Sequence, residues 1–150
     1  MLLTTEKPEG FEATMNIVGI VILVGHEVLL LKRSKDKKHF PLTWNLPSGK
    51  VEVGEEVIDA AVRELYEEAG IHLTAADLTL GAQFYHYDDA QPGAGIIFNA
   101  FVARRESKPQ VILNEESEEY TWVHHGNLRE VSPLMYGEQM IVSTAIATTL

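Results

Sequence analysis

The segment from Gly49 to Ile71 constrains the fold more than any other part of the chain, because it sets a helix between loop-forming glycines. Gly54 ends a loop, and the acidic residues directly after it bring negative charge to the unpaired amides of a first helical turn. Gly70 stands where a left-handed C-terminal cap is expected. Together these signals predict a helix over residues 56–69.

The two sides of this predicted helix carry different chemistry. At 3.6 residues per turn, Glu64, Glu67 and Glu68 are related by i, i+3 and i+4 and share one face. The adjoining face is apolar and should be buried; its residues are Ile58, Ala61, Val62, Leu65 and Ala69. Like charges at this spacing destabilise a helix by ~0.2–0.5 kcal/mol per pair, so a hard divalent cation is expected to offset them. A solvated acidic face is the simpler alternative.

The same segment resembles the signature of the Nudix hydrolase family, also called MutT-like, which is G-x5-E-x7-R-E-U-x-E-E-x-G-U with U a bulky aliphatic residue. Every specified position is filled, by Gly49, Glu55, Arg63, Glu64, Leu65, Glu67, Glu68, Gly70 and Ile71. The resemblance implies an α/β fold of the Nudix type, an α/β/α sandwich with a mixed β-sheet between helices. It also implies a metal-dependent hydrolase that acts on a nucleoside diphosphate linked to another group.

The resemblance further implies roles for individual residues. The implied ligands of two or more Mg²⁺ ions, or of Mn²⁺ in their place, are Glu64, Glu67, Glu68 and the carbonyl of Gly49. Arg63 and Glu55 are implied to pair and to brace the loop against the helix. In such proteins a further carboxylate often comes from the segment before a later Trp-Val strand, where Glu116 is the first candidate and Glu119 the second. Glu64 or that later segment is the candidate general base.

Composition limits the classes of protein and of partner. With 150 residues the chain is long enough for one domain with a sizeable core, so we expect a single domain over 1–150 with an arm or short edge segment at 1–14. No segment resembles a signal peptide or a membrane span, which makes a cytoplasmic location the expectation. The absence of cysteine argues against an isopentenyl diphosphate isomerase-like enzyme, which shares the fold but uses a cysteine. The net charge of -10 argues against nucleic-acid binding.

The remaining sequence predicts strands on both sides of the helix. The expected strands cover residues 15–24, 28–33, 78–87, 95–104 and 120–124. The first two are separated by a Gly-His turn and should form a hairpin, and a loop at 88–94 should separate the third from the fourth. Ser132 followed by Pro133 predicts the start of a C-terminal helix, with Ser as N-cap and Pro in the first turn.

Three residues outside the helix segment are candidates for substrate binding. Arg33 ends a predicted strand, lies in the basic stretch 32–38, and carries a planar guanidinium that matches phosphate oxygens. A surface ion pair is the alternative for this arginine. Tyr85 and Tyr87 share one face of their strand, and His86 lies on the other. Half-buried packing is the alternative for the tyrosines, and a satisfied surface histidine is the alternative for His86.

The sequence therefore predicts a hydrolase that splits a phosphoanhydride by attack of an activated water on phosphorus, with small nucleotides as substrates. Nucleoside triphosphates are the first choice. Dinucleoside polyphosphates are the second, because Tyr87 stands where such hydrolases tend to carry a tyrosine; nucleotide sugars and ADP-ribose also stay open. The alternative of another class is a catalytically idle Nudix domain that binds a nucleotide. Family members are commonly homodimers, so a homodimer is compatible with the resemblance, but the residues do not decide it.

Overall fold

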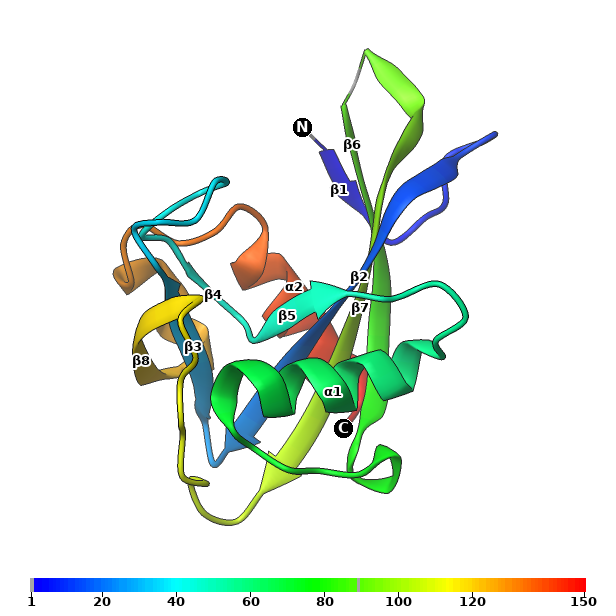
Figure 1. Cartoon of the computed structure of the whole chain (residues 1–150). Helices are drawn as coiled ribbons and strands as arrows, with labels where there is room; N and C mark the ends of the chain where they lie inside the picture. Colours follow the sequence, from blue (N-terminus) through cyan, green and yellow to red (C-terminus); the bar gives the residue numbers. More distant parts are fainter. Residues whose placement is uncertain (1, 89) are drawn as a thin grey trace.

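The computed structural model describes residues 2–88 and 90–150 of the chain (Figure 1). Its strands are β1 (Leu2–Thr4), β2 (Glu12–Val24), β3 (Glu27–Arg33), β4 (Trp44–Asn45), β5 (Ser48–Lys50), β6 (Thr79–Asp88), β7 (Gln91–Arg105) and β8 (Ser117–His124). The helices are α1 (Val57–Ala69) and α2 (Glu138–Thr148), with short 3-10 turns η1 (Ala75–Asp77) and η2 (His125–Glu130). None of the described helices is long and apolar enough to cross a membrane.

A mixed sheet forms the middle layer of the molecule. Its strand order is β1-β6-β7-β2-β3-β4, with β5 also paired to β2 and β8 paired to β3. The central pair β2 and β7 is parallel, whereas the other paired strands run antiparallel. In Figure 1, α1 crosses in front of this sheet and α2 lies behind it. The expected α/β/α arrangement with a mixed sheet is therefore confirmed.

The predicted hairpin of β2 and β3 exists only at its tip. The two strands pair at Leu23 with Val28 and at Val24 with Glu27, and then separate. Beyond that point β2 pairs with β5 and β7, and β3 pairs with β4 and β8. The segment that holds β4 and β5 fills the gap between the two diverging strands. The start of the Nudix signature is thereby held between the two halves of the sheet.

One predicted loop and one predicted helix start were wrong. The loop expected at 88–94 is shorter, because β6 and β7 continue pairing through a register shift to Asp88 and Gln91; Asp89 lies outside the described residues. Much of the expected arm at 1–14 is in the sheet, as β1 and the start of β2, and Met1 is not described. The helix predicted from Ser132 begins instead at Glu138, because the backbone around Pro133 hydrogen-bonds to Trp44.

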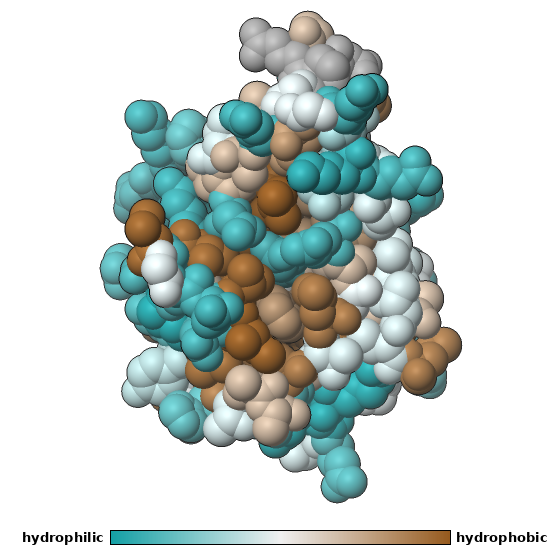
Figure 2. Space-filling view, turned by 90° about the vertical axis from the view of Figure 1, so that its right-hand side faces the viewer, coloured by the Kyte–Doolittle hydropathy of each residue, from teal (hydrophilic) through white to brown (hydrophobic). Residues whose placement is uncertain are grey.

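Two apolar clusters lie on opposite faces of the sheet. Val18, Ile20 and Ile22 of β2 pack towards α1, whereas Val21 and Leu23 pack towards α2. Such alternation gives one strand a role in both cores, because successive side chains point to opposite faces. On the face seen in Figure 2, hydrophilic side chains surround a band of apolar ones.

Helix α1 is anchored by small and branched apolar residues, as its sequence predicts. Ala61, Leu65 and Ala69 are buried, and Gly70 takes the expected left-handed cap with a φ of 67°. Ile58 and Val62 are only partly buried, whereas Ala60 is fully buried. The helix is therefore rotated so that its carboxylate face also approaches the protein, and Glu64 becomes a buried residue.

Candidate active site

Gly49 allows the backbone of β5 to pass directly against the helix carboxylates. It pairs with Val18 of β2, and a Cβ atom at this position would lie 2.0 Å from Cδ of Glu64. Real Cβ atoms do not approach so closely, so any other residue would force the carboxylate of Glu64 out of this position. The side chain of Glu64 is only 11% exposed in this contact. The first glycine of the signature is thus a packing requirement of the site.

Arg63 connects the loop after β5 to helix α1. Its Nε and Nη2 donate to the two carboxylate oxygens of Glu55 at 2.8 and 3.0 Å, and Nη2 also donates to the carbonyl of Lys50 at 2.9 Å. Its Nη1 donates to Glu64 at 2.9 Å and to Glu67 at 3.2 Å. Hydrogen bonds from Arg63 and from the Glu52 amide lower the pKa of Glu55 to about 2. The contact between Arg63 and Glu55 is bidentate, with two parallel hydrogen bonds, and such a contact fixes the orientation of the loop relative to the helix.

The carboxylates of α1 differ in their surroundings. Burial raises the pKa of Glu68 to about 8, and the charges of Glu116 and Glu64 add to this rise. Burial also raises the pKa of Glu64, against the opposing effect of Arg63. Glu67 has a side chain that is 49% exposed. Carboxyl groups are therefore crowded on the side of α1 that faces β5 and Glu116, where a bound cation would stabilise their charged forms.

Glu116 is the later carboxylate that the fold brings to α1. Its oxygens accept hydrogen bonds from Nζ of Lys37 at 3.0 Å and from Asn114 at 3.3 Å. Burial alone would raise the pKa of Glu116, but these donors outweigh it and hold the pKa below its usual range. The second candidate, Glu119, is 58% exposed and lies 3.7 Å from Lys32 instead. The structure thus places Glu116, and not Glu119, in the electrostatic environment of Glu68.

The donor set fits a hard divalent cation in its chemistry. Carboxylate and carbonyl oxygens are the ligands that Mg²⁺ and Mn²⁺ prefer. Here Glu64 lies against the Gly49 backbone, Glu68 accepts from the Ser48 amide, and the charge of Glu116 acts on both carboxylates. Glu67 lies on the same helix and contacts Arg63. As the described side chains stand, no three His, Asp or Glu residues form a ready cage. Three of these carboxylates are held by the protein's own cations, Glu64 and Glu67 by Arg63 and Glu116 by Lys37. Metal binding therefore requires some of these contacts to exchange.

Arg33 contacts the loop that follows it. Its Nε and Nη2 donate to the carbonyl of His39 at 3.0 and 2.8 Å. This is neither the surface ion pair nor the free phosphate-binding fork considered from the sequence. The bidentate contact ties the loop 34–43 to the end of β3, and it leaves the positive charge of Arg33 close enough to Glu116 to lower that residue's pKa.

The tyrosines of β6 lie on the opposite side of the strand from the pocket described next. The rings of Tyr85 and Tyr87 meet Phe11 edge-on, with centroids 5.2 and 6.5 Å apart. His86 points to the other face and stacks on Tyr136 at 5.5 Å. The packing alternative thus describes both tyrosines in this structure. The histidine that the sequence reasoning set aside is the β6 side chain that faces the pocket.

An apolar pocket of about 200 Å³ lies on the α2 side of the sheet, beside the β4–β5 segment. Its lining consists of Leu3, Ile17, Phe40, Asn45, Ser48, His86, Ile96, Phe98, Met135, Tyr136, Glu138 and Ile141. Nε2 of His86 is buried without a hydrogen-bond partner among the described residues. Glu138 is 3% exposed, accepts from the Leu46 amide at 3.1 Å, and has its pKa raised to about 7 by burial. Glu138 is the one charged residue of α2, a signal that could have marked it in the sequence.

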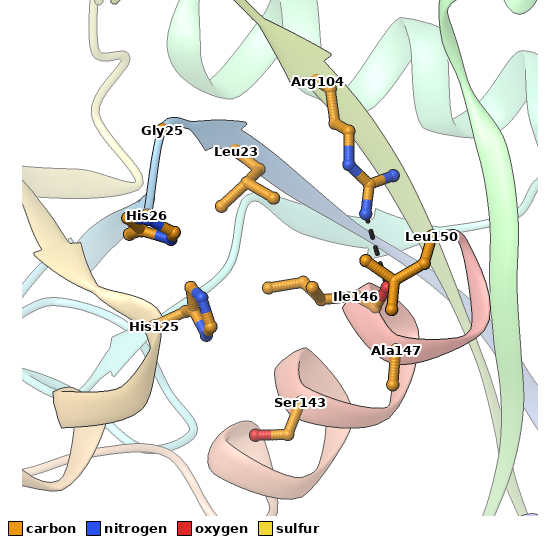
Figure 3. A pocket seen from close by; sticks show the side chains of 9 residues that line it. All are labelled: Leu23, Gly25, His26, Arg104, His125, Ser143, Ile146, Ala147 and Leu150. Carbon is orange, nitrogen blue, oxygen red and sulfur yellow. Dashed lines mark hydrogen bonds between the residues drawn. The ribbon is translucent and has the colours of Figure 1, made fainter.

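Ser48 connects this pocket to the helix carboxylates. It lines the pocket, its hydroxyl accepts from the Asn45 amide group at 3.2 Å, and its backbone amide donates to Glu68 at 3.4 Å. A second and larger pocket, of about 500 Å³, lies at the β2–β3 turn and is lined by His26, His125, Arg104 and residues of α2 (Figure 3). None of the α1 carboxylates lines that second pocket. The candidate site therefore consists of the carboxylates and the smaller pocket.

The comparisons with known proteins agree with this geometry. The model of the NUDIX domain matches residues 13–139. The chain is 33% identical over 107 residues to the nucleoside triphosphatase NudI of Escherichia coli O1:K1 / APEC, which covers 63% of this chain and 71% of that protein. It is 46% identical over 59 residues to the m7GpppN-mRNA hydrolase NUDT17 of Xenopus laevis, covering 37% of this chain but only 20% of that protein.

The solved structures lead to the same family. A MutT NUDIX hydrolase from Burkholderia pseudomallei superposes with a TM-score of 0.71 at 28% identity, covering 89% of this chain and 98% of that one. The family match spans most of the sequence, and the structural match covers most of both chains. The chain therefore belongs to the Nudix hydrolase family.

Proposed function

We propose that this Nudix hydrolase is a Mg²⁺-dependent pyrophosphohydrolase of nucleoside triphosphates. The observation that carries the proposal is the connection through Ser48, which places an apolar pocket next to the carboxylates of α1. A nucleoside triphosphate has the matching two parts, an apolar planar base and a polyanionic chain. The relative NudI, named a nucleoside triphosphatase, supports this choice of substrate.

The carboxylates form the reacting end of the proposed site. The residues that would hold the ion are Glu64, Glu67, Glu68 and Glu116, with the Gly49 carbonyl as a further oxygen. A bound Mg²⁺ supplies charge neutralisation at the phosphate oxygens and lowers the pKa of a coordinated water. Arg63, through Glu55, keeps the loop after β5 and the helix in fixed relation. Such positioning is what phosphoryl transfer demands of a protein, because the reaction itself needs little covalent help.

The smaller pocket is proposed to hold the base. Its volume of about 200 Å³ is below the ~300–1,000 Å³ of pockets that enclose a whole small molecule, so it suits one part of a substrate. Its apolar walls would bury a flat ring. The His86 nitrogen and the Glu138 carboxyl are buried polar groups that a heterocycle with donors and acceptors on its edge would satisfy.

Dinucleoside polyphosphates, nucleotide sugars and ADP-ribose are the competing substrates of the same site. The relative NUDT17 is named a hydrolase of capped mRNA, but the chain spans only about a fifth of that protein. Longer substrates would need a second binding surface beyond the pocket. Tyr87, the sequence signal for dinucleoside polyphosphates, packs against Phe11 on the other face of β6. The contacts of the structure therefore favour the triphosphate.

The proposal is tested by a hydrolysis screen with Mg²⁺ across nucleoside triphosphates, dinucleoside polyphosphates, nucleotide sugars and ADP-ribose, with products identified. We expect a nucleoside monophosphate and pyrophosphate from one or more triphosphates, at a higher kcat/KM than from the other classes. A higher kcat/KM for another class would overturn the substrate assignment. Specific nucleotide binding without any hydrolysis would favour the catalytically idle domain instead.

A further inference from the structure

The basic loop between β3 and β4 contains one lysine whose side chain reaches the candidate site. Among the ion pairs of the described residues, Lys32 contacts Glu118 and Glu119, whereas Lys37 contacts Glu116 at 3.0 Å. The charge of Lys37 also acts on Glu68, where it opposes the rise in pKa that burial causes. Lys37 is thus the lysine of this loop that the fold directs at the carboxylates.

The position of Lys37 is set by the backbone around it. The amide of Lys37 donates to the carbonyl of Ser34 at 3.1 Å, and the amide of Ser34 donates to the carbonyl of Glu116 at 2.9 Å. Ser34 is itself buried, and its hydroxyl accepts from the Asp36 amide at 3.2 Å. The turn that carries Lys37 is therefore hydrogen-bonded to the backbone of the residue that its side chain contacts. The meeting of these two side chains follows from the fold.

The contact itself is weakly held compared with that of Arg63. It is a single hydrogen bond, and the two side chains remain 28% and 39% exposed. An ammonium group is a point charge on a flexible stem and can move to another anion without losing a fixed geometry. Arg63, in contrast, is tied to Glu55 through both carboxylate oxygens and to a backbone carbonyl. A cation that arrives at the carboxylates will therefore displace Lys37 before it displaces Arg63.

We propose that Lys37 is an exchangeable counter-cation, which holds Glu116 until a divalent ion takes that carboxylate and then pairs with a phosphate oxygen of the substrate. This inference rests on the proposed function only in requiring a substrate that carries phosphate. It makes Lys37 a positioning residue for the ion and a binding residue for the polyphosphate. Binding of the ion frees Lys37 to contact phosphate. By thermodynamic linkage, bound phosphate must then raise the affinity for the ion by the same factor.

The first test measures Mn²⁺ binding to the metal-free protein by electron paramagnetic resonance, without substrate. Lys37→Met removes the competing cation, so Mn²⁺ should bind about two- to fivefold more tightly, which is the range expected from an exposed ion pair. Lys38→Met is the matched control, since it removes the same charge from the exposed neighbouring residue. It should stay within about twofold of the parent, and Lys37→Arg, which keeps the charge, should do the same.

The second test measures calorimetric binding of imidodiphosphate, a diphosphate that resists hydrolysis, at saturating Mn²⁺. Loss of a charge-assisted contact in Lys37→Met should weaken binding about tenfold, with Lys38→Met close to the parent. Equal Mn²⁺ affinities of the two methionine variants would overturn the proposal, and so would an unchanged affinity for imidodiphosphate. Neither measurement needs turnover. A failed triphosphate screen together with both expected binding changes would therefore reject the proposed substrate and leave the role of Lys37 standing.

Discussion

Arg63 and Lys37 hold carboxylates on two sides of the same site, but they hold them differently. Arg63 makes hydrogen bonds to three glutamates and one backbone carbonyl, from a side chain that is 25% exposed. Among the described residues, the side chain of Lys37 makes one hydrogen bond, to Glu116. Exposed single pairs of the second kind are worth about 0.2–1 kcal/mol, whereas a bidentate arginine fixes geometry as well as charge. The difference separates a permanent brace from a replaceable counter-ion.

The largest expected effect tests Glu68, the carboxylate on which the charges of Glu64, Glu116 and Lys37 act. Glu68→Gln keeps the size of the side chain and an oxygen for the Ser48 amide, but removes a charge from the proposed ion site. We expect Mg²⁺-dependent hydrolysis to fall by about 100-fold or more, equivalent to ~2.7 kcal/mol of the barrier. Initial rates at saturating Mg²⁺ measure this. Glu119→Gln is the control and should stay near the parent; equal rates in both variants would remove Glu68 from the site.

The next effect tests whether Arg63 acts through its fork. Arg63→Lys keeps the charge but cannot contact both oxygens of Glu55 and the Lys50 carbonyl together. We expect kcat to fall about 10- to 100-fold, as for other groups that orient ligands, with a lowered Tm. Glu52→Gln is the matched control, because Glu52 lies 3.9 Å from Arg63 and is 69% exposed. If kcat and Tm of Arg63→Lys matched those of Glu52→Gln, Arg63 would not act through its geometry and would not differ from Lys37 in this respect.

A third prediction concerns Glu138, for which the described residues contain no ion-pair partner. Its pKa is raised from 4.5 to about 7, so between these pH values the folded protein holds a proton that the unfolded chain has released. Stability therefore falls as pH rises through this window, by about 3 kcal/mol at most, and is unaffected by this group above it. Denaturant unfolding from pH 4.5 to 8 should show a flatter profile for Glu138→Gln. Parallel profiles of variant and parent would contradict the prediction.

The smallest effect is a difference in salt dependence. Mobile ions screen exposed charges, so the gap in Mn²⁺ affinity between the parent and Lys37→Met should shrink by about half or more between 50 mM and 500 mM KCl. The gap between the parent and Arg63→Lys should change less, because that contact depends on geometry as well as charge. Binding isotherms at both salt concentrations test this. If salt reduced both affinity differences equally, Arg63 and Lys37 would not differ in how they hold their carboxylates.

Local patterns were sufficient for the helix of the site. The spacing of its carboxylates, its apolar side and its glycine cap all predict α1, and Arg63 does contact Glu55. The carboxylates of the helix are about one helical turn apart, so helical geometry relates them. The contact between Arg63 and Glu55, which are eight residues apart, was implied by the family resemblance. The choice of Glu116 before Glu119 came from the family resemblance. It agrees with the electrostatic contact to Glu68, which joins residues far apart in the chain.

Tertiary pairing decided the features that local patterns misjudged. The β2–β3 hairpin opens because β5 pairs with β2 beyond the tip, and the backbone near Pro133 pairs with β4 before α2 can start. Tyr85 and His86 are adjacent in sequence, yet the position of Phe11 and of the pocket gives them unrelated surroundings. A strand pattern states that neighbours face opposite ways but not which face meets the site.

The contrast between Arg63 and Lys37 has the same origin. The Nudix signature names Arg63 because its partners lie within the segment, and short-range spacing brings them together. Lys37 belongs to a basic loop in which no local rule distinguishes one lysine from the next. Only the hydrogen bonds from Ser34 to Glu116 and from Lys37 to Ser34 bring that one side chain to a site carboxylate. Contacts between distant segments depend on the folded path of the chain, and therefore only the tertiary structure could assign them.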